Sequence, residues 1–400
     1  DEFALSTDLI DGDGCSLTGL VALSRAAVVP VCLARSVAAT NRLSPEANRR
    51  YALWKTASLV PRALRRLAVR GRLPSGPVCA TASEPAVVPS SMTVLRFLPR
   101  LLARRLIARH HRQHNVEHWQ LAWRRAEAPL DPAAPSQRGM RPLQTPHGHF
   151  WADPFLFHDH GRYWLFFEDL PYASGIGRIG CVEMAQTGPV GAARTVLELD
   201  SHLSYPQLFR WQGGIYLMPE NGDANRVRVY RALEFPWRWE PAADILTGHN
   251  FSDATLWQHE DGRWYLFANV SESGGSVHDE LFLFHADNPF GPWWPHAENP
   301  IVSDVRRARA AGPLFRHEGR LIRPAQDCAW NYGRAINFHV IDELSLTRYV
   351  ERPLSRLRGY WSKDLHGCHT YTRADRLEAM DGKAFRSRRA VGASAMREPD

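Results

Sequence analysis

The sequence predicts an all-β protein, a five-bladed β-propeller with four-stranded blades and a smaller N-terminal α/β or helical region. Three observations predict this fold. A hairpin pattern occurs four times along the chain, and its turn glycines are spaced like the blades of a propeller. A fifth, degenerate copy near the C-terminal end is completed by a segment upstream of the first copy.

The hairpin pattern is clearest in residues 151–169, WADPFLFHDHGRYWLFFED. Two apolar runs flank a polar turn centred on Gly161, which is the pattern of two short antiparallel strands. The pattern returns at 204–220, 252–269 and 310–327, each time with a leucine and an aromatic residue shortly before a turn glycine. Repetition of one hairpin indicates a repeat fold.

The spacing of the turn glycines identifies the kind of repeat. Gly161, Gly213, Gly262 and Gly319 lie 52, 49 and 57 residues apart, which suits a propeller blade rather than a helical solenoid. Each unit therefore has room for two outer strands. The candidates after the second and third hairpins are 227–232, 235–239, 281–286 and 290–294.

The fifth copy, at 366–381, lacks an outer strand. Residues 118–124, HWQLAWR, supply this strand if the two ends of the domain meet. A ring closed in this way has no open sheet edges. We therefore expect the propeller to span 115–385, followed by a disordered tail over 386–400.

Residues 1–75 are predicted to form a separate region, with an apolar run over 17–34 and a helical pattern over 51–71 that ends at a glycine. Residues 76–114 are predicted to be a linker that leads into a basic amphipathic helix. In 92–112, leucines and arginines alternate at helical spacing. We expect these leucines to pack on the propeller; the alternative is contact with an anionic lipid surface or with nucleic acid.

Positive charge is concentrated in one part of the chain. The formal net charge is +7, but residues 41–125 alone carry +14, which leaves −7 elsewhere. Because packing of the basic helix on the propeller explains this segment, we expect no nucleic-acid partner.

The compartment is predicted from what the sequence lacks. Six cysteines contain no CxxC pair, so neither a zinc cluster nor a disulfide framework is indicated. Arg25 and Pro30 interrupt the best candidate for an apolar run of about 18 residues. The acidic start lacks the basic beginning of a signal peptide. We expect a cytoplasmic protein, peripheral to the membrane if the basic helix contacts lipid.

The repeat also predicts where chemistry takes place. If the first strand of each hairpin starts at the channel mouth and the second returns to it, Asp153 and Glu168 end at the same face. Equivalent positions of the other blades join them there. These are Tyr205, Asp253 and His369 at strand starts, and Glu220, Asn269, Gln326 and Asp327 at strand ends. The sequence thus predicts that carboxylates converge on one mouth.

Glycosidic chemistry needs two carboxyl groups, one as acid and one as base or nucleophile. We assign Asp153 as base or nucleophile, Glu220 as general acid, and Asp253 as the residue that tunes or positions them. Glu220 follows the apolar residues 217–219, so we expect it to be partly desolvated, with a raised pKa. The alternative for each is a local structural role, such as capping backbone amides in a turn.

Other residues at the mouth are candidates for substrate binding. These are Glu168, Tyr205, Asn269, Arg323, Asp327, His369 and Trp151. Arg323 and Asp327 either clamp an anionic group or brace their blade. Glu168 either binds substrate or is neutralised by Arg178, and His369 is either a ligand contact or a hydrogen-bonded support. We predict no metal and no cofactor.

Several blocks of the chain resemble a specific family, the domain that precedes the transferase region in plant glucosamine inositolphosphorylceramide transferases and in bacterial relatives linked to formyltransferase-like domains. The blocks are FWADPF (150–155), LFFED (165–169), SYPQLF (204–209), LMPEN (217–221), SDATLW (252–257), FGPW (290–293), NPIVSDVRRARAAGPLF (299–315) and RLIRPAQDC (320–328). The five-blade plan is also distantly similar to propeller glycosidases of the arabinanase and xylosidase type. These resemblances imply a carbohydrate-related propeller.

Residues 1–75 are similar to the C-terminal part of a formyltransferase catalytic domain. Such enzymes need an Asn and a His upstream of this part, so we do not expect formyl transfer from this chain. The leading hypothesis is a carbohydrate-active propeller, glycosidase-like or associated with glycosyl transfer, that binds or acts on a charged sugar at the channel mouth. The alternative is a non-catalytic glycan-binding or scaffolding propeller beside a formyltransferase or glycosyltransferase domain.

Overall fold

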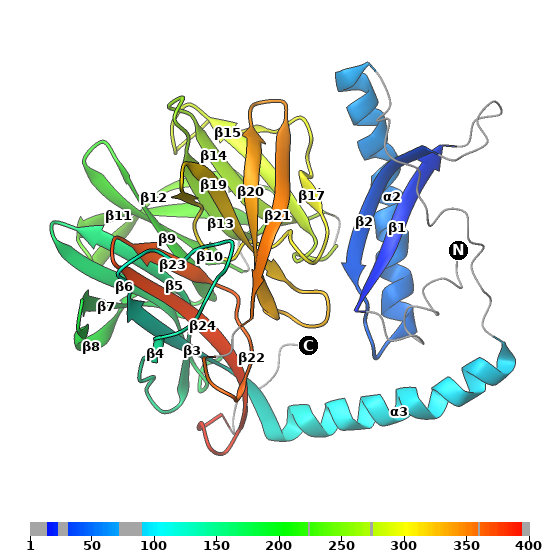
Figure 1. Cartoon of the computed structure of the whole chain (residues 1–400), viewed down its shortest axis with the longest axis horizontal. Coiled ribbons are helices and arrows are strands. Elements are labelled where there is room, and N and C mark those ends of the chain that lie inside the picture. Colours follow the sequence, from blue (N-terminus) through cyan, green and yellow to red (C-terminus); the bar gives the residue numbers. More distant parts are fainter. Residues whose placement is uncertain are drawn as a thin grey trace.

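The structure, a computed structural model, describes residues 14–22, 31–71, 90–222, 225–272, 275–358 and 361–393. Within these residues, five antiparallel sheets of at least four strands form the five-bladed propeller that the sequence predicts. In Figure 1 the strands from β3 to β24 form one body, while β1, β2 and α2 lie beside it and α3 runs from that region back to the propeller.

Blades one to four are each built from strands that follow one another in the chain. Blade one contains β5 (His149–Asp159), β6 (Arg162–Pro171), β7 (Arg178–Ala185) and β8 (Gly188–Leu197). Blade two contains β9 (Leu203–Trp211), β10 (Gly214–Asn221), β11 (Arg226–Glu234) and β12 (Arg238–Thr247). Blade three contains β13 (Asn250–Gln258), β14 (Trp264–Ser271), β15 (Glu280–Ala286), β16 (Trp294–Pro295) and β17 (Val302–Ser303). Blade four contains β18 (Phe315–His317), β19 (Arg320–Asp327), β20 (Ala335–Leu344) and β21 (Tyr349–Leu357).

The predicted turn glycines close the inner hairpins. Gly161, Gly213 and Gly319 each form a two-residue turn with the residue before them, and both residues of each turn have positive φ. This is the type I′ geometry, whose twist matches that of the flanking strands. Gly262 also has positive φ, in a longer turn between β13 and β14. Turn chemistry read from the sequence therefore located all four hairpins.

Blade five closes the ring. It combines β22 (Leu365–Gly367), β23 (Tyr371–Ala374) and β24 (Leu377–Ser387) with β3 (Asn115–Arg125) and β4 (Arg141–Pro142). β24 pairs with β3 along its whole length, from Leu377 opposite Arg125 to Ser387 opposite Asn115. Residues 118–124 therefore provide the outer strand, as the repeat pattern predicted.

The predicted tail begins later than expected. β24 continues to Ser387, and Ala393 is buried in a cluster that includes Val116 and Trp119. The start at residue 386 was therefore wrong, because the last strand extends to the full length of its partner. Residues 394–400 lie outside the described residues.

The N-terminal region combines two strands with a helix. β1 (Cys15–Ala22) pairs antiparallel with β2 (Val31–Ala39), and α2 (Pro45–Arg70) follows them. α2 begins after the N-cap Ser44 and ends at Gly71, whose left-handed backbone is the glycine stop that the sequence predicted. The Pro-, Ser- and Ala-rich part of the predicted linker falls on 72–89, outside the described residues.

This region is docked on the propeller through buried charges. The Lys55 Nζ of α2 lies 2.6 Å from Glu280 Oε1 on β15, and Arg62 Nη1 donates to the same oxygen at 2.8 Å. Arg62 also pairs with Glu272 at 2.6 Å. Because all three charged groups of the central cluster are buried, losing one of them would leave the others uncompensated.

The basic segment forms α3 (Ser91–His114), as predicted, but the expected packing of its leucines on the propeller was wrong. Phe97 and Leu101 are its buried residues, whereas Leu95, Leu102 and other apolar side chains are exposed. Among the described residues, neither α2 nor α3 is apolar enough over a sufficient length to cross a membrane.

Ring closure can be tested at Gly312, which lies ahead of β18 with φ of 106° and donates its N–H to Tyr205 Oη at 3.0 Å. A Cβ at this position would collide with the backbone oxygen of Tyr371 in blade five. We expect Gly312→Ala to lose roughly 1–3 kcal/mol more unfolding free energy in urea than the control Gly262→Ala, which has positive φ but open space around it. Equal losses in the two variants would contradict this packing.

Candidate functional site

Three inner strands carry the same backbone irregularity. Asp153, Tyr205 and Asp253 have φ of 49°, 47° and 48°, in the left-handed region that residues other than glycine seldom occupy. The strand registers of β5 and β13 break at Asp153 and Asp253. A bulge of this kind re-aims a side chain. Each of these residues makes a hydrogen bond outside its own blade: Asp153 to the Tyr205 N–H, Tyr205 to Thr255, and Asp253 to Arg309. The bulges therefore serve contacts between blades.

The channel mouth contains a pocket of about 360 Å³. It brings together four of the predicted site residues, Asp153, Glu168, Glu220 and His369. Eight further residues complete the lining, namely Trp119, Phe150, Leu170, His202, Ser204, His278, Arg309 and Tyr332. The predicted convergence of carboxylates from blades one and two on one mouth is therefore present in the structure.

Asp153 is buried in the wall of this pocket. Its Oδ1 accepts a hydrogen bond from Thr370 Oγ1 at 2.7 Å, and its Oδ2 accepts one from the Tyr205 backbone N–H at 3.2 Å. Burial raises the pKa of Asp153 to about 7, although the nearby His369 acts in the opposite direction. Asp153 can therefore exchange a proton near neutral pH.

His369 links Asp153 to a second buried carboxylate. Its Nδ1 lies 2.5 Å from Asp381 Oδ2 and its Nε2 lies 3.6 Å from Asp153 Oδ1. Its ring stacks on Trp119 at a centroid distance of 3.9 Å. Burial alone would lower the pKa of His369, but Asp381 and Asp153 outweigh it and raise the pKa to about 9. The ring is thus an imidazolium held between two carboxyl groups, which fits the support role.

The same three residues are the group among the described residues whose ligand atoms lie close enough to hold a metal, within 4.8 Å of one another. However, Asp381 already accepts hydrogen bonds from the His369 and Thr370 N–H groups on one oxygen and from the Asp153 N–H on the other. The arrangement therefore suits a hydrogen-bonded relay better than a metal centre.

Asp253 does not line the pocket, because Arg309 covers it. Arg309 Nε donates to Asp253 Oδ2 at 2.6 Å, and Gln326 Nε2 donates to the same oxygen at 3.2 Å. Burial raises the pKa of Asp253 to about 7 against the opposing effect of Arg309. The backbone N–H of Asp253 in turn donates to Glu220 Oε2 at 2.7 Å. Asp253 therefore positions both Arg309 and Glu220 from behind the mouth.

Glu220 is partly buried at the edge of the pocket. Its side chain is 12% exposed, whereas those of Asp153 and Asp253 are more fully enclosed. The side chain is therefore largely enclosed, as expected, while its strand end lies at the pocket. Among the described residues, none donates a hydrogen bond to its second oxygen, Oε1.

Two histidines at the rim are set by their neighbours. Arg309 Nη1 donates to His278 Nδ1 at 2.9 Å, and burial, aided by Arg309, lowers the pKa of His278 to about 3. His202 Nε2 lies 3.2 Å from Glu168 Oε1. Burial lowers the pKa of His202, but Glu168 outweighs burial and raises this pKa to about 9, which favours a charged ring. The Gly177 N–H, however, lies 3.1 Å from Nδ1 and can donate only to an unprotonated nitrogen. We favour the neutral ring with its proton on Nε2, because this hydrogen bond fixes the tautomer.

Other predicted binding residues lie away from the mouth. Tyr205 is fully buried, with its hydroxyl 2.8 Å from Thr255 Oγ1, and acts on the site only through its backbone N–H. Asn269 is also fully buried and donates to the Glu280 backbone oxygen at 3.0 Å. Asn269 therefore belongs to the interior of blade three, whereas Tyr205 lies between blades, where its hydroxyl also accepts a hydrogen bond from the Gly312 N–H at 3.0 Å.

Arg323 and Asp327 do not form a clamp. Arg323 pairs with Glu351 of β21 at 2.8 and 2.9 Å, while Asp327 pairs with Arg356 at 2.5 Å. Each partner comes from the outer strand of the same blade, so the bracing alternative fits both residues.

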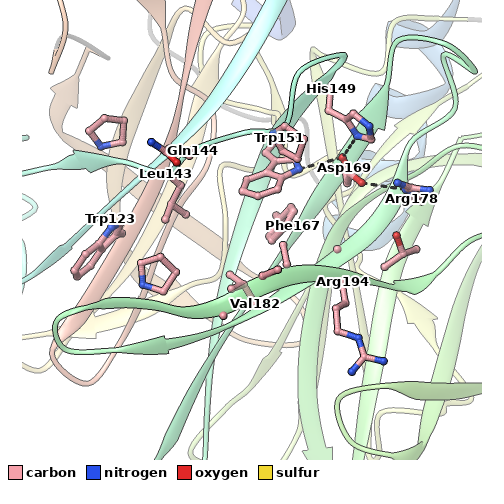
Figure 2. Close-up of a pocket in the computed structure, with 18 residues that line it drawn as sticks. Trp123, Leu143, Gln144, His149, Trp151, Phe167, Asp169, Arg178, Val182 and Arg194 are labelled. Atoms are coloured by element: carbon pink, nitrogen blue, oxygen red, sulfur yellow. Dashed lines mark hydrogen bonds and ion pairs between the residues drawn. The ribbon is translucent and has the colours of Figure 1, made fainter.

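Trp151 lines a different pocket, of about 510 Å³, between blades five and one. Figure 2 shows it beside Asp169, whose carboxylate accepts hydrogen bonds from Trp151 Nε1 at 3.0 Å and Arg178 Nε at 3.0 Å. His149 Nδ1 lies 2.7 Å from the same carboxylate. Arg178 thus neutralises Asp169 rather than Glu168, and Trp151 does not reach the mouth.

Sequence reasoning missed several members of the site. His202 and His278 come from segments outside the repeated hairpin, whereas Arg309, between β17 and β18, lies in the block 299–315 that carries the family resemblance. No repeat signal marks such positions. Asp381 lies on β24, the second strand of blade five. Comparison of this strand with the second strands of blades one and two, which carry Glu168 and Glu220, could have found it.

Comparison with known proteins identifies relatives of the propeller region. The family model described as glucosamine inositolphosphorylceramide transferase 1, N-terminal, matches residues 114–389. The transferase 1 of Oryza sativa subsp. japonica is 34% identical over 238 residues, which covers 58% of this chain and 31% of that protein. The Arabidopsis thaliana transferase 1 is 35% identical over 214 residues, covering 52% and 28%. The chain thus spans about a third of the length of these relatives.

Solved structures with a similar propeller include glycoside hydrolases. A GH43 β-xylosidase/α-arabinofuranosidase from a compost microbial metagenome, in complex with xylotriose, has a TM-score of 0.44 at 12% identity and covers 64% of this chain and 93% of its own. A GH43_1 enzyme from Xanthomonas citri with xylose has a TM-score of 0.45 at 12% identity, covering 60% and 87%. The family match begins at residue 114, so the formyltransferase resemblance of residues 1–75 stays a prediction.

The protonation of His369 has a measurable consequence. Its pKa is raised from 6.5 to about 9 on folding, so its contribution to stability is complete below pH 6.5 and is lost as the pH rises through 9. Across this window we expect the unfolding free energy of the wild type to fall, relative to His369→Gln, by about 1.4 kcal/mol per pH unit in urea titrations. His160→Gln, whose ring is 91% exposed, should follow the wild type. Parallel curves for wild type and His369→Gln would refute the relay.

Proposed function

The chain belongs to the family of glucosamine inositolphosphorylceramide transferase 1 N-terminal domains, and from this premise we propose that its propeller recognises a sugar with a charged group at the mouth pocket. One observation carries the proposal. Asp153, Glu168 and Glu220 share a pocket of about 360 Å³ with the aromatic residues Trp119 and Tyr332. A concave site with apolar walls and a few convergent polar groups is typical of small-ligand recognition.

The charge balance of the pocket favours a cationic group on the sugar. Arg309 is paired with Asp253 at 2.6 Å, and His369 is paired with Asp381 at 2.5 Å, so both cations are matched within the wall. Glu220 also lines the pocket; its Oε2 lies 3.9 Å from Arg309 Nη2, while its Oε1 accepts no hydrogen bond from the described residues. An amine would supply that missing donor. The glucosamine in the names of the relatives agrees with this proposal.

Asp153 and Glu220 are the pair proposed to act on the bound sugar. With a pKa of about 7, Asp153 can accept or donate a proton at neutral pH, as general acid–base chemistry requires. The His369 imidazolium orients it, and Asp253 positions Glu220 through its backbone N–H. Asp253 therefore keeps the positioning role that we assigned it from the sequence, without touching the substrate.

A second candidate is recognition without turnover. Both oxygens of Asp153 already accept hydrogen bonds from the protein, and Asp253 is covered by Arg309. Such a site binds a glycan equally well as a module beside a glycosyltransferase or formyltransferase domain. The same pocket serves both candidates, so binding and turnover have to be measured separately.

Binding is tested with a matched pair of ligands. We expect glucosamine to bind at least about 10-fold more tightly than N-acetylglucosamine at neutral pH in calorimetric titrations, because only the amine is charged. Glu220→Gln should remove most of this preference, and Glu198→Gln, whose side chain is 61% exposed on the outside of blade one, should keep it. Equal affinities for the two sugars would rule out an amine-selective mouth.

Turnover separates the two candidates. If the propeller cleaves or transfers, Asp153→Asn should reduce turnover of an amino-sugar glycoside by at least about 100-fold while the sugar still binds. The wild-type rate should change around pH 7, where Asp153 titrates. Binding by the wild type with no turnover of any glycoside in a panel would leave recognition alone.

A further inference from the structure

α3 is a long helix that carries basic and apolar residues. Its 24 residues span about 36 Å. They include six arginines and three histidines but no aspartate or glutamate. In Figure 1 the helix extends well beyond the edge of the propeller, with only its C-terminal end next to β3. Most of the length of α3 is therefore not packed against the propeller (Figure 1).

One side of α3 presents an apolar stripe. Leu95, Leu98, Leu102 and Leu106 follow one another at spacings of three, four and four residues, which places them on one face of a helix. Their exposed fractions lie between 48% and 68%. The buried residues Phe97 and Leu101 lie on a different face, so docking of the helix on this protein does not use the stripe.

Arginines border the stripe on both sides. In the helical projection Arg105 lies beside Leu98 on one edge, Arg109 falls within the stripe about one turn beyond Leu106, and Arg96 and Arg100 lie on the other side beyond Leu106. Arg105 Nε donates to the Leu43 backbone oxygen at 2.8 Å, so this edge also joins α3 to the N-terminal region. An apolar face flanked by cationic side chains is the pattern of a helix that lies in the interface of a membrane.

We infer that α3 binds an anionic lipid surface, with the leucine stripe at the headgroup boundary and the arginines on the phosphates. Charge complementarity selects this occupant. A second copy of the chain would bring two sets of arginines together and offers no acidic residue in α3 to match them. An anionic leaflet supplies both the apolar layer that the stripe needs and the negative charge that the arginines need.

The C-terminal end of α3 is tied to the propeller, so membrane binding would hold the propeller at the lipid surface. The Arg388 N–H donates to the His114 backbone oxygen at 2.9 Å, and Arg388 Nε donates to the Arg112 backbone oxygen at 3.0 Å. The His111 ring also packs edge-on against Phe385 of β24 at 4.7 Å. These contacts make the helix a fixed extension of blade five. The inference is independent of what the mouth pocket binds.

The test is sedimentation of the full chain with vesicles of phosphatidylcholine, with and without about 30 mol% phosphatidylserine. We expect binding only to the anionic vesicles, weakened by raised salt. The double variant Leu95→Gln/Leu102→Gln should bind at least about 10-fold more weakly, and so should Arg96→Gln/Arg100→Gln. The control Val190→Gln/Leu233→Gln, which changes exposed apolar residues of blades one and two, should bind like the wild type.

Because all four α3 positions are exposed, their variants should unfold at the temperature of the wild type, which shows that lost binding is not lost folding. Absence of binding to anionic vesicles would overturn the inference, as would equal binding to both vesicle types. A concentration-dependent dimer in light scattering that Leu95→Gln/Leu102→Gln abolishes, without vesicle binding, would also overturn it and assign the stripe to a second copy. Capture of an acidic protein by the stripe, again without vesicle binding, would do the same.

Discussion

The pairing of β24 with β3 is the interaction on which both the fold and the candidate site depend. It joins the last strand of the propeller to its first and leaves none of the five described blades as an open ring end. It also assembles the mouth, because Asp381 lies on β24 and Trp119 lies on β3. Between them sits His369, paired with the first and stacked on the second. Without closure, Asp153 of blade one would lose the imidazolium and the Thr370 hydroxyl that hold its carboxyl group.

The mouth is a compromise between burial and charge. Burial raises the pKa of a carboxyl group, and a nearby cation lowers it. Arg309 has this effect on Asp253, and His369 has it on Asp153. The two aspartates still titrate near neutral pH, since burial dominates over their cationic neighbours. Glu220 is treated differently, because its strand end opens into the pocket. A site with two buried aspartates of raised pKa and a third carboxylate that lines the pocket suits the proposed recognition of a charged sugar.

α2 and α3 differ in what their charged and apolar side chains contact. α2 buries Lys55 and Arg62 against Glu280 and so becomes part of the propeller wall. α3 leaves Leu95, Leu98, Leu102 and Leu106 exposed, and it contains no aspartate or glutamate of its own. Glu280 and Glu272 of blade three face α2, whereas α3 presents exposed leucines beside exposed arginines such as Arg96 and Arg100. This combination of an exposed apolar stripe with exposed arginines is why we infer that α3 binds an anionic membrane surface.

The sequence by itself determined the fold, because its signals are local. Turn glycines such as Gly161 and Gly213 set the hairpins, their spacing set the blades, and residues 118–124 completed the fifth. The same periodicity placed Asp153, Glu168, Glu220 and His369 at one mouth. Only the tertiary structure decided which charges meet. Arg309 arrives from a connecting segment to cover Asp253, Arg323 turns to Glu351, and α3 leaves its leucines in solvent. Such pairings join residues far apart in the chain, and no local pattern records them, because each depends on which blade or helix lies opposite.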